Sequence, residues 1–230
     1  MNYTLLQSTI ASRLNRKDLE SQIQTWIYNA RRNIVAGTLP IVASSGFAYH
    51  RFSWAYATTT LSTVASTATV DIPDAYIDEI DLFYASGNKP LVKSTIQDMN
   101  NSFYANNDST DTGVPTNYAI LATQLKLYPI PDGVYDLTLY YYGYPDTLVN
   151  GSDEKTIDKL CPDLIIDLCC YEGGSWLHDN NLQIQFGEAS KNRYYNLVTT
   201  DKRRQMTNTD MRMKTYHDMD INLYKGRQMQ

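Results

Sequence analysis

The feature that most restricts the fold is a change of hydrophobic period along the chain. Near the N-terminus apolar residues recur at helical spacing, which allows one side of each helix to be buried. This stripe comprises Leu6, Ile10, Leu14, Leu19, Ile23, Trp26, Ile27, Ala30 and Ile34. From about residue 38 to residue 150 the pattern gives way to short β-branched and aromatic segments. We therefore expect helices and strands in separate parts of one chain, which is an α+β fold.

The N-terminal helices, residues 1–37, carry start and stop signals. Asp18 precedes the second apolar stripe, and its carboxylate can accept hydrogen bonds from the unpaired N–H groups of a first turn, so we expect it to be an N-cap. Gly37 and Pro40 follow the stripe and predict its end.

Residues 38–150 are predicted to form an inserted antiparallel β-sandwich or barrel-like domain. Short segments of this kind, separated by Pro, Gly, Asn and Asp, are typical of such folds. One interruption, Thr95–Tyr104, is predicted to be a short helix. The candidate strands are Phe52–Tyr56, Thr67–Ile72, Ile77–Tyr84, Tyr118–Ala122, Gln124–Tyr128 and Tyr135–Tyr142.

Helices return over residues 151–200 and should complete a bundle with the N-terminal helices. Pro162 suits the first turn of a helix whose apolar face carries Leu164, Ile165, Leu168 and Cys169. A second stretch carries Phe186, Ala189, Tyr194 and Leu197. Gly173-Gly174 between them fits either a close helix crossing or a break. The expected core of the bundle includes Trp26, Ile27, Leu164, Ile165 and Leu168.

Residues 201–230 differ from the rest and are predicted to be an extended C-terminal arm. These residues contain seven Lys or Arg and four Asp, which gives them a local net charge of +3. Because the whole chain has a net charge of −5, residues 1–200 carry −8. Residues 211–216 alternate Met, Met and Thr with Arg, Lys and Tyr, which is strand period over a short span. Such an arm is expected to order against a partner, the alternative being a solvated tail. The expected docking residues are Arg203, Arg204, Met211, Arg212, Met213, Lys214, Tyr216 and Tyr224.

Catalytic, metal and cofactor sites are not expected. The three histidines, His50, His178 and His217, lie in no nucleophile or triad signature, and each is interpreted as a surface or half-buried polar residue. The adjacent Cys169 and Cys170 lack metal-ligand spacing, and core filling is the better interpretation. No glycine-rich phosphate loop or dinucleotide fingerprint occurs.

Composition excludes further classes. With 43% apolar and 20% charged residues the chain is globular, and a net charge of −5 argues against a dedicated nucleic-acid binder. No window holds the roughly 20 apolar residues of a membrane span. Asp78, Glu79 and Asp81 are interpreted as an exposed acidic edge of the sheet.

Several stretches, taken in order over about residues 5–200, resemble the head-to-tail adaptor (connector) proteins of short-tailed bacteriophages. The most telling is residues 127–137, Leu-Tyr-Pro-Ile-Pro-Asp-Gly-Val-Tyr-Asp-Leu, which run into Tyr140-Tyr141-Tyr142. The other stretches are Trp26–Arg31, Asp71–Tyr76, Gly113–Tyr118 and Cys161–Ile166.

The resemblance implies a structural virion protein of the head–tail junction, made in the host cytoplasm and without catalysis or cofactor. Such adaptors form a homo-oligomeric ring, usually of twelve copies, beneath the portal protein. They dock tail or nozzle proteins below and leave a channel through which genome DNA passes without specific binding. Helices typically build the ring wall, and the C-terminal arm reaches the portal or a neighbouring copy.

Two other functions are compatible with the residues alone. A β-sandwich module could bind carbohydrate or peptide through exposed aromatics of Tyr135–Tyr144. A hydrolase using His178 is a more distant possibility. The binding module predicts a stable monomer with a ligand groove, whereas the adaptor predicts contacts with neighbouring copies.

Overall fold

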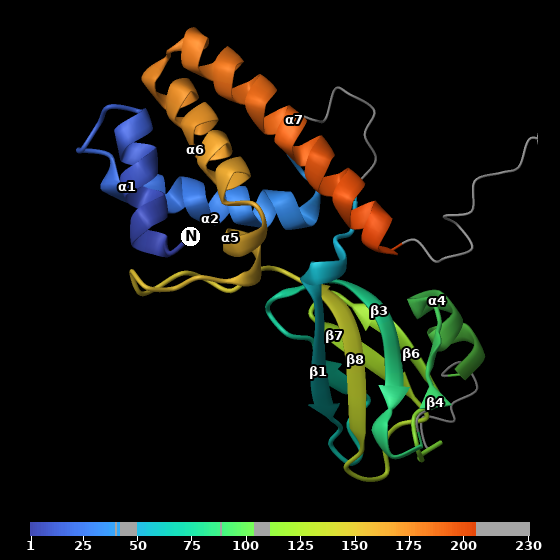
Figure 1. The fold of residues 1–230 in the computed structure, drawn as a ribbon. Coiled ribbons are helices and arrows are strands. Elements are labelled where there is room, and N and C mark those ends of the chain that lie inside the picture. The colour runs from blue at the N-terminus through green and yellow to red at the C-terminus, as the bar shows by residue number, and fades with distance from the viewer. Residues whose placement is uncertain (40, 42–49, 88, 104–110, 206–230) are drawn as a thin grey trace, which may run out of the picture.

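The computed structural model describes residues 1–39, 41, 50–87, 89–103 and 111–205 of the chain. The described chain forms a helical unit and a β unit that lie end to end (Figure 1). The predicted α+β class is therefore confirmed.

Both ends of the described chain contribute to the helical unit, and the β unit lies between them in sequence. The helical unit contains α1 (Tyr3–Arg13), α2 (Glu20–Ala36), α5 (Thr156–Leu160), α6 (Pro162–Leu177) and α7 (Asn180–Gln205). The β unit contains β1 (Tyr56–Ser62), β2 (Thr69–Asp71), β3 (Tyr76–Tyr84), β4 (Lys89–Pro90), β5 (Val92–Lys93), β6 (Asn117–Leu121), β7 (Gln124–Tyr128) and β8 (Asp136–Gly143). A short helix, α4 (Ile96–Asp98), continues as a π-helical stretch (Met99–Phe103), within the predicted interruption.

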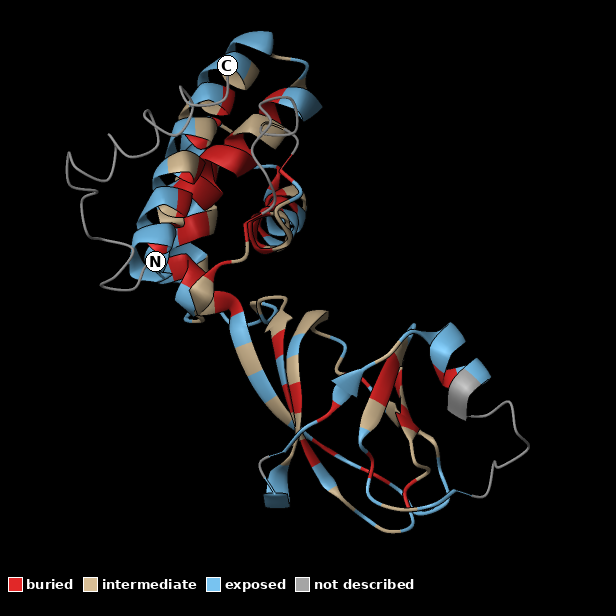
Figure 2. Ribbon diagram, turned by 90° about the vertical axis from the view of Figure 1, so that its right-hand side faces the viewer, coloured by how far each residue is buried: buried red, intermediate tan, exposed pale blue. Residues whose placement is uncertain are grey.

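One hydrophobic core joins the N-terminal and C-terminal helices. Trp26 and Ile27 of α2 pack in the same cluster as Leu164, Ile165 and Leu168 of α6, and all five are buried as predicted. Figure 2 shows buried residues concentrated where the helices face one another. The cluster also includes residues of the segment before β1, so the helical core extends beyond the helices themselves.

Helix α6 runs without a break through Gly173 and Gly174, which decides between the two interpretations of this pair. A Cβ at Gly173 would lie 2.7 Å from Leu14 Cδ1 and 3.3 Å from the ring of Trp26. The glycine therefore allows α1 and α2 to approach α6 closely.

Two details of the helices differ from the predictions. The N-cap of α2 is Leu19 and not Asp18, whose carboxylate instead binds the Arg16 guanidinium at 2.7 and 2.5 Å. The end of α2 at Gly37 is confirmed, since this residue has the left-handed φ of 68° of a C-cap. In α7 the fully buried residues are Gly187, Ser190, Tyr194, Val198 and Asp201. Of the predicted stripe, Tyr194 is therefore buried, and Phe186 and Leu197 are partly buried against the same core.

The β unit consists of two four-stranded sheets that share a second hydrophobic core. Their strand orders are β1-β8-β3-β4 and β2-β7-β6-β5. Leu82 and Leu139 from the first sheet pack with Leu125 and Leu127 from the second. Strand β7 has the predicted bounds, whereas predicted strand Phe52–Tyr56 is a 3₁₀ turn (Ser53–Ala55) that leads into β1.

The expected exposure of the acidic edge is wrong, because Asp78, Glu79 and Asp81 are all partly buried; strand β4 pairs with β3 only at Phe83 and Tyr84. The Glu79 side chain is only 7% exposed; it accepts a hydrogen bond from Tyr76 and pairs with Lys93. Asp78 pairs with Arg51. These carboxylates therefore have structural partners.

Candidate interaction surface at the end of helix α7

The predicted docking residues begin within α7, because this helix continues to Gln205. Arg203 and Arg204 lie exposed in its last turn, where cations favour the negative end of the helix dipole. The other six, which are Met211, Arg212, Met213, Lys214, Tyr216 and Tyr224, lie outside the described residues. The point from which the predicted arm departs is therefore defined.

Asp201 ties this last turn of α7 to the segment that precedes β1. One carboxylate oxygen lies 2.8 Å from His50 Nε2 and accepts the backbone N–H of Ser53 at 3.1 Å, and the other accepts the Ser53 hydroxyl at 2.6 Å. Gln205 donates to Asp201 at 2.8 Å and to the carbonyl of Arg51 at 3.2 Å. We refer to Asp201, His50, Ser53 and Gln205 as the α7 clamp.

The clamp holds an ionised carboxylate in a buried place. Asp201 is 2% exposed. Burial alone would raise the pKa of its carboxyl, but the hydrogen bonds from Ser53 and His50 outweigh burial and hold the pKa below its ordinary value. Four donors around one carboxylate give charge-assisted hydrogen bonds, which are stronger than neutral ones.

Although the clamp contains Ser, His and Asp, its geometry is not that of a catalytic triad. In a triad the histidine lies between the other two and takes the proton of the serine hydroxyl. Here Ser53 and His50 both contact Asp201 directly, so the Ser53 hydroxyl is directed at the carboxylate. This arrangement fixes the backbone.

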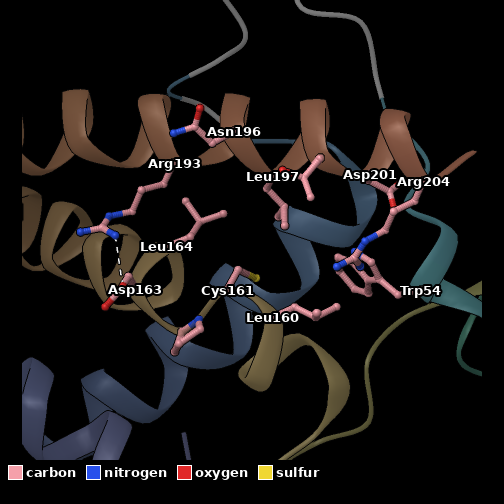
Figure 3. Close-up of a pocket in the computed structure, with 12 residues that line it drawn as sticks. Trp54, Leu160, Cys161, Asp163, Leu164, Arg193, Asn196, Leu197, Asp201 and Arg204 are labelled. Atoms are coloured by element: carbon pink, nitrogen blue, oxygen red, sulfur yellow. Dashed lines mark hydrogen bonds and ion pairs between the residues drawn. The ribbon is translucent and has the colours of Figure 1, made fainter. Parts of the chain in front are cut away.

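Beside the clamp, a groove of about 330 Å³ runs between α7 and the turn that joins α5 to α6. Figure 3 shows Trp54 and Arg204 at one end and the Arg193–Asp163 ion pair at the other. Apolar side chains, including Leu160 and Leu197, form part of its wall. The groove therefore offers apolar surface with charged residues at its ends.

Trp54 connects this groove to a second one of about 350 Å³ between the helical and β units. Its indole N–H is buried and has no hydrogen-bond acceptor within the described chain. Tyr56, Tyr144 and Lys155 line the second groove with it. Aromatic residues with a polar handle are common anchors in protein interfaces.

Two buried carboxylates hold the helices that form the first groove. Asp167 of α6 accepts from Arg13 of α1 and from Arg193 of α7, both at 2.6 Å. Asp158 of α5 pairs with Arg31 of α2 at 2.9 Å, and both side chains are at most 2% exposed. The groove wall is therefore fixed by charge pairs between segments distant in sequence.

The histidines and cysteines are placed as follows. His50 is buried in the clamp, which corrects the prediction of a surface or half-buried position. His178 is exposed at the turn between α6 and α7, and His217 lies outside the described residues. Cys169 and Cys170 are buried core residues as predicted. Burial raises the pKa of Cys170 to about 12, so its thiol is neutral at ordinary pH.

Neither the α7 clamp nor the buried Arg31–Asp158 pair was predicted from the sequence. A signal for the clamp exists, because Asp201 continues the helical spacing of Tyr194 and Val198 and therefore places a carboxylate on a buried face. Nothing in the sequence indicates which residue it binds, since His50 is 151 positions away.

Two properties of the described residues bear on other classes of function. No group of three or more His, Cys, Asp or Glu side chains there could hold a metal ion. None of the helices in the same residues combines the length and the apolar character needed to cross a membrane.

Comparison with known families gives one match. None of the curated proteins compared matches the sequence. The family of the SU10 adaptor protein matches residues 1–216, which include the helical unit, the β unit and the first eleven residues beyond α7. With nearly the whole sequence matched, the chain belongs to the SU10 adaptor protein family, a family of structural phage head-to-tail adaptors.

Proposed function

We propose that this protein is a virion component of the head–tail junction that assembles as a ring beneath the portal. The family match over residues 1–216 carries this proposal, because it makes the chain a phage adaptor. In this proposal the ring has about twelve copies, docks tail or nozzle proteins on its lower side and leaves a central channel for DNA.

We further infer a division of the chain into four parts. Residues 1–37 and 151–200 build a helical bundle that serves as the ring wall, and residues 38–150 are an inserted β-sandwich domain. Residues 201–230, of which 201–205 form the last turn of α7, are an arm that reaches the portal or a neighbouring copy. Its docking residues are Arg203, Arg204, Met211, Arg212, Met213, Lys214, Tyr216 and Tyr224. The shared core of the terminal helices and the separate core of the β unit support this division.

The α7 clamp supports the role of the arm. It joins the last turn of α7 to residues 50–53, so the following chain leaves from a fixed position beside two grooves. The arm also has the opposite sign of charge from residues 1–200, which favours docking on an acidic partner surface.

The test compares three versions of the protein: the full chain, a chain ending at Gln205 and a full chain with Arg212→Ala and Lys214→Ala. The truncation retains every residue of the clamp and should leave the thermal unfolding transition unchanged. We expect it to weaken binding to the portal strongly, and the double variant to weaken it partly, in a pull-down on the portal. A matched control, Asn208→Ala with Thr209→Ala, should bind normally.

The mass of the full chain is then measured alone and with the portal by light scattering. A ring in either sample supports the proposal. A stable monomer in both samples would contradict ring assembly and favour the ligand-binding module. Normal portal binding by the truncated chain would remove the arm from the mechanism.

A further inference from the structure

The four sheet edges in the described chain differ in how they are protected. Three of the edge strands, β2, β4 and β5, have only two or three residues, and β4 consists of Lys89 and Pro90. Short strands, lysine and proline are the usual means of preventing another chain from pairing with an edge. The fourth edge strand, β1, lacks all of these.

Strand β1 is seven residues long, with the sequence Tyr-Ala-Thr-Thr-Thr-Leu-Ser. It contains no charge and no proline, and its register with β8 is regular from Tyr56 to Ser62. Within the described residues its outer edge pairs with no strand. Its outward-facing residues are exposed, including Tyr56 at 50%. Such an edge is a template for an added strand.

We propose that the outer edge of β1 receives residues 211–216 of a second copy of this chain as a fifth strand. This inference rests on the proposed ring function. A contact in which one copy donates a segment and the next copy accepts it is heterologous, and repetition of that contact closes a ring.

The two faces of the proposed strand match the two faces of β1. Thr58 and Thr60 lie with Tyr56 on the exposed face, whereas Leu61 is buried in the β core. In residues 211–216, Arg212, Lys214 and Tyr216 share one face, and the methionines share the other. The basic face therefore lies beside Tyr56, where a cation can contact the ring, and the methionines extend the apolar side.

The arm also departs from a place close to the β1 edge. Gln205 donates to the carbonyl of Arg51, five positions before the start of β1. The side chain of Arg51 lies over the ring of Tyr142, and Tyr142 pairs with Tyr56. Each subunit thus presents its donor segment and its acceptor edge near the junction of its two units. Residues 206–210 can span roughly 17 Å when extended, which allows passage to an adjacent subunit.

The test uses disulfide formation between copies that each carry one added cysteine. In the first mixture Thr58→Cys chains are combined with Lys214→Cys chains, so both thiols lie on the same face of the proposed sheet. In the second mixture Thr58→Cys chains are combined with Met213→Cys chains, whose thiol lies on the opposite face. Two further mixtures, Tyr56→Cys chains with Lys214→Cys chains and Thr60→Cys chains with Lys214→Cys chains, test pairings shifted by two residues along β1. The native cysteines are buried, and the parent chain serves as the blank.

Under mild oxidation we expect a heterodimer in at least one same-face mixture, in about tenfold excess over the opposite-face mixture. Equal yields would overturn strand addition. Crosslinks that form only within a single chain carrying both substitutions would overturn the assignment to a second copy. If light scattering shows rings but no mixture crosslinks, this interface is wrong and the adaptor function stands. Monomers without crosslinks would contradict both the strand interface and the proposed ring.

Discussion

The helical unit and the β unit accommodate polar groups in different ways. In and beside the helical unit, Arg31, Asp158, Asp167 and Asp201 are all at most 2% exposed and pair with residues on other segments. In the β unit, tyrosine hydroxyls pair with carboxylates nearer the surface, as in Tyr135 with Asp132.

This difference follows from how each unit is connected. The helical unit joins segments separated by the whole β unit, and helices have no backbone ladder to set their relative positions. Charged groups that bind only in one arrangement can define those positions. In the sheets, backbone pairing sets the register, as in the seven pairs between β1 and β8. Charge pairs in the β unit are correspondingly closer to the surface: even Glu79, at 7% exposed, pairs with Lys93, which is 54% exposed.

The largest effect is expected from breaking the most buried pair of the helical unit. Arg31→Met leaves Asp158 as an unpaired buried carboxylate and should lower the free energy of unfolding by about 3–5 kcal/mol. Adding Asp158→Asn removes that charge and should recover part of the loss. Urea unfolding of both variants measures the effect. If the single and double variants lose the same amount, the pair does not contribute as a pair.

A second test compares two glycines of neighbouring helices. Gly173→Ala would place its methyl 2.7 Å from Leu14 Cδ1, and this crowding should lower the free energy of unfolding by about 1–3 kcal/mol. The better helix propensity of alanine offsets about 1 kcal/mol of that loss. In Gly187→Ala the new methyl would lie 3.4 Å from its nearest neighbour, Tyr171 Cδ2, which is an ordinary contact. This change should therefore stabilise the protein by about 0.5–1 kcal/mol. Thermal melting of both variants should shift in opposite directions. Equal shifts would mean that α6 does not cross closely at Gly173.

The α7 clamp predicts a dependence of stability on pH. Because the pKa of Asp201 is lowered by folding, its contribution is fully present above the unfolded-state pKa of about 3.9 and is lost as pH falls through the lower folded pKa. Asp201→Asn should cost about 1–3 kcal/mol at pH 7, and the difference from the parent should shrink below about pH 4. Urea unfolding at several pH values measures this difference.

The matched control for the clamp is Asp132→Asn at the surface of the β unit. Its difference from the parent should be small at pH 7, in contrast to that of Asp201→Asn. A loss as large as that of Asp201→Asn would contradict the proposed contrast between the two units.

The smallest effect is expected at the rim of the β unit. Tyr135→Phe removes a hydroxyl that binds Asp132 on an exposed surface, and water can replace this partner. The unfolding midpoint should stay within experimental error of the parent. A clear loss of stability would show that the tyrosine–carboxylate pairs hold the sheet, as the charge pairs hold the helices.

Local patterns predicted much of the secondary structure but not the contacts between segments. The apolar spacing of α2 and the bounds of β7 follow from a few consecutive residues. Strand β1 was missed because three consecutive threonines lie at its centre, which hides the alternation that ends in buried Leu61. The family resemblance was confirmed by the match over residues 1–216.

The candidate interaction surface was predicted less well than the fold, for a physical reason. Basic and methionine-rich composition indicates an interacting segment, but it does not show where the segment departs. That position depends on Asp201 meeting His50, a contact between residues 151 positions apart. Only folding of the intervening chain brings such residues together.

The α7 clamp has a mechanical consequence. Tension applied beyond Gln205 reaches residues 50–53 through Asp201 and Gln205, within one helical turn of the point where force enters. These residues lead into β1, and Phe52 among them is buried in the helical core, so the load is shared between the helical unit and the β unit. A pull on the C-terminal end would therefore reach both units at the place where they meet.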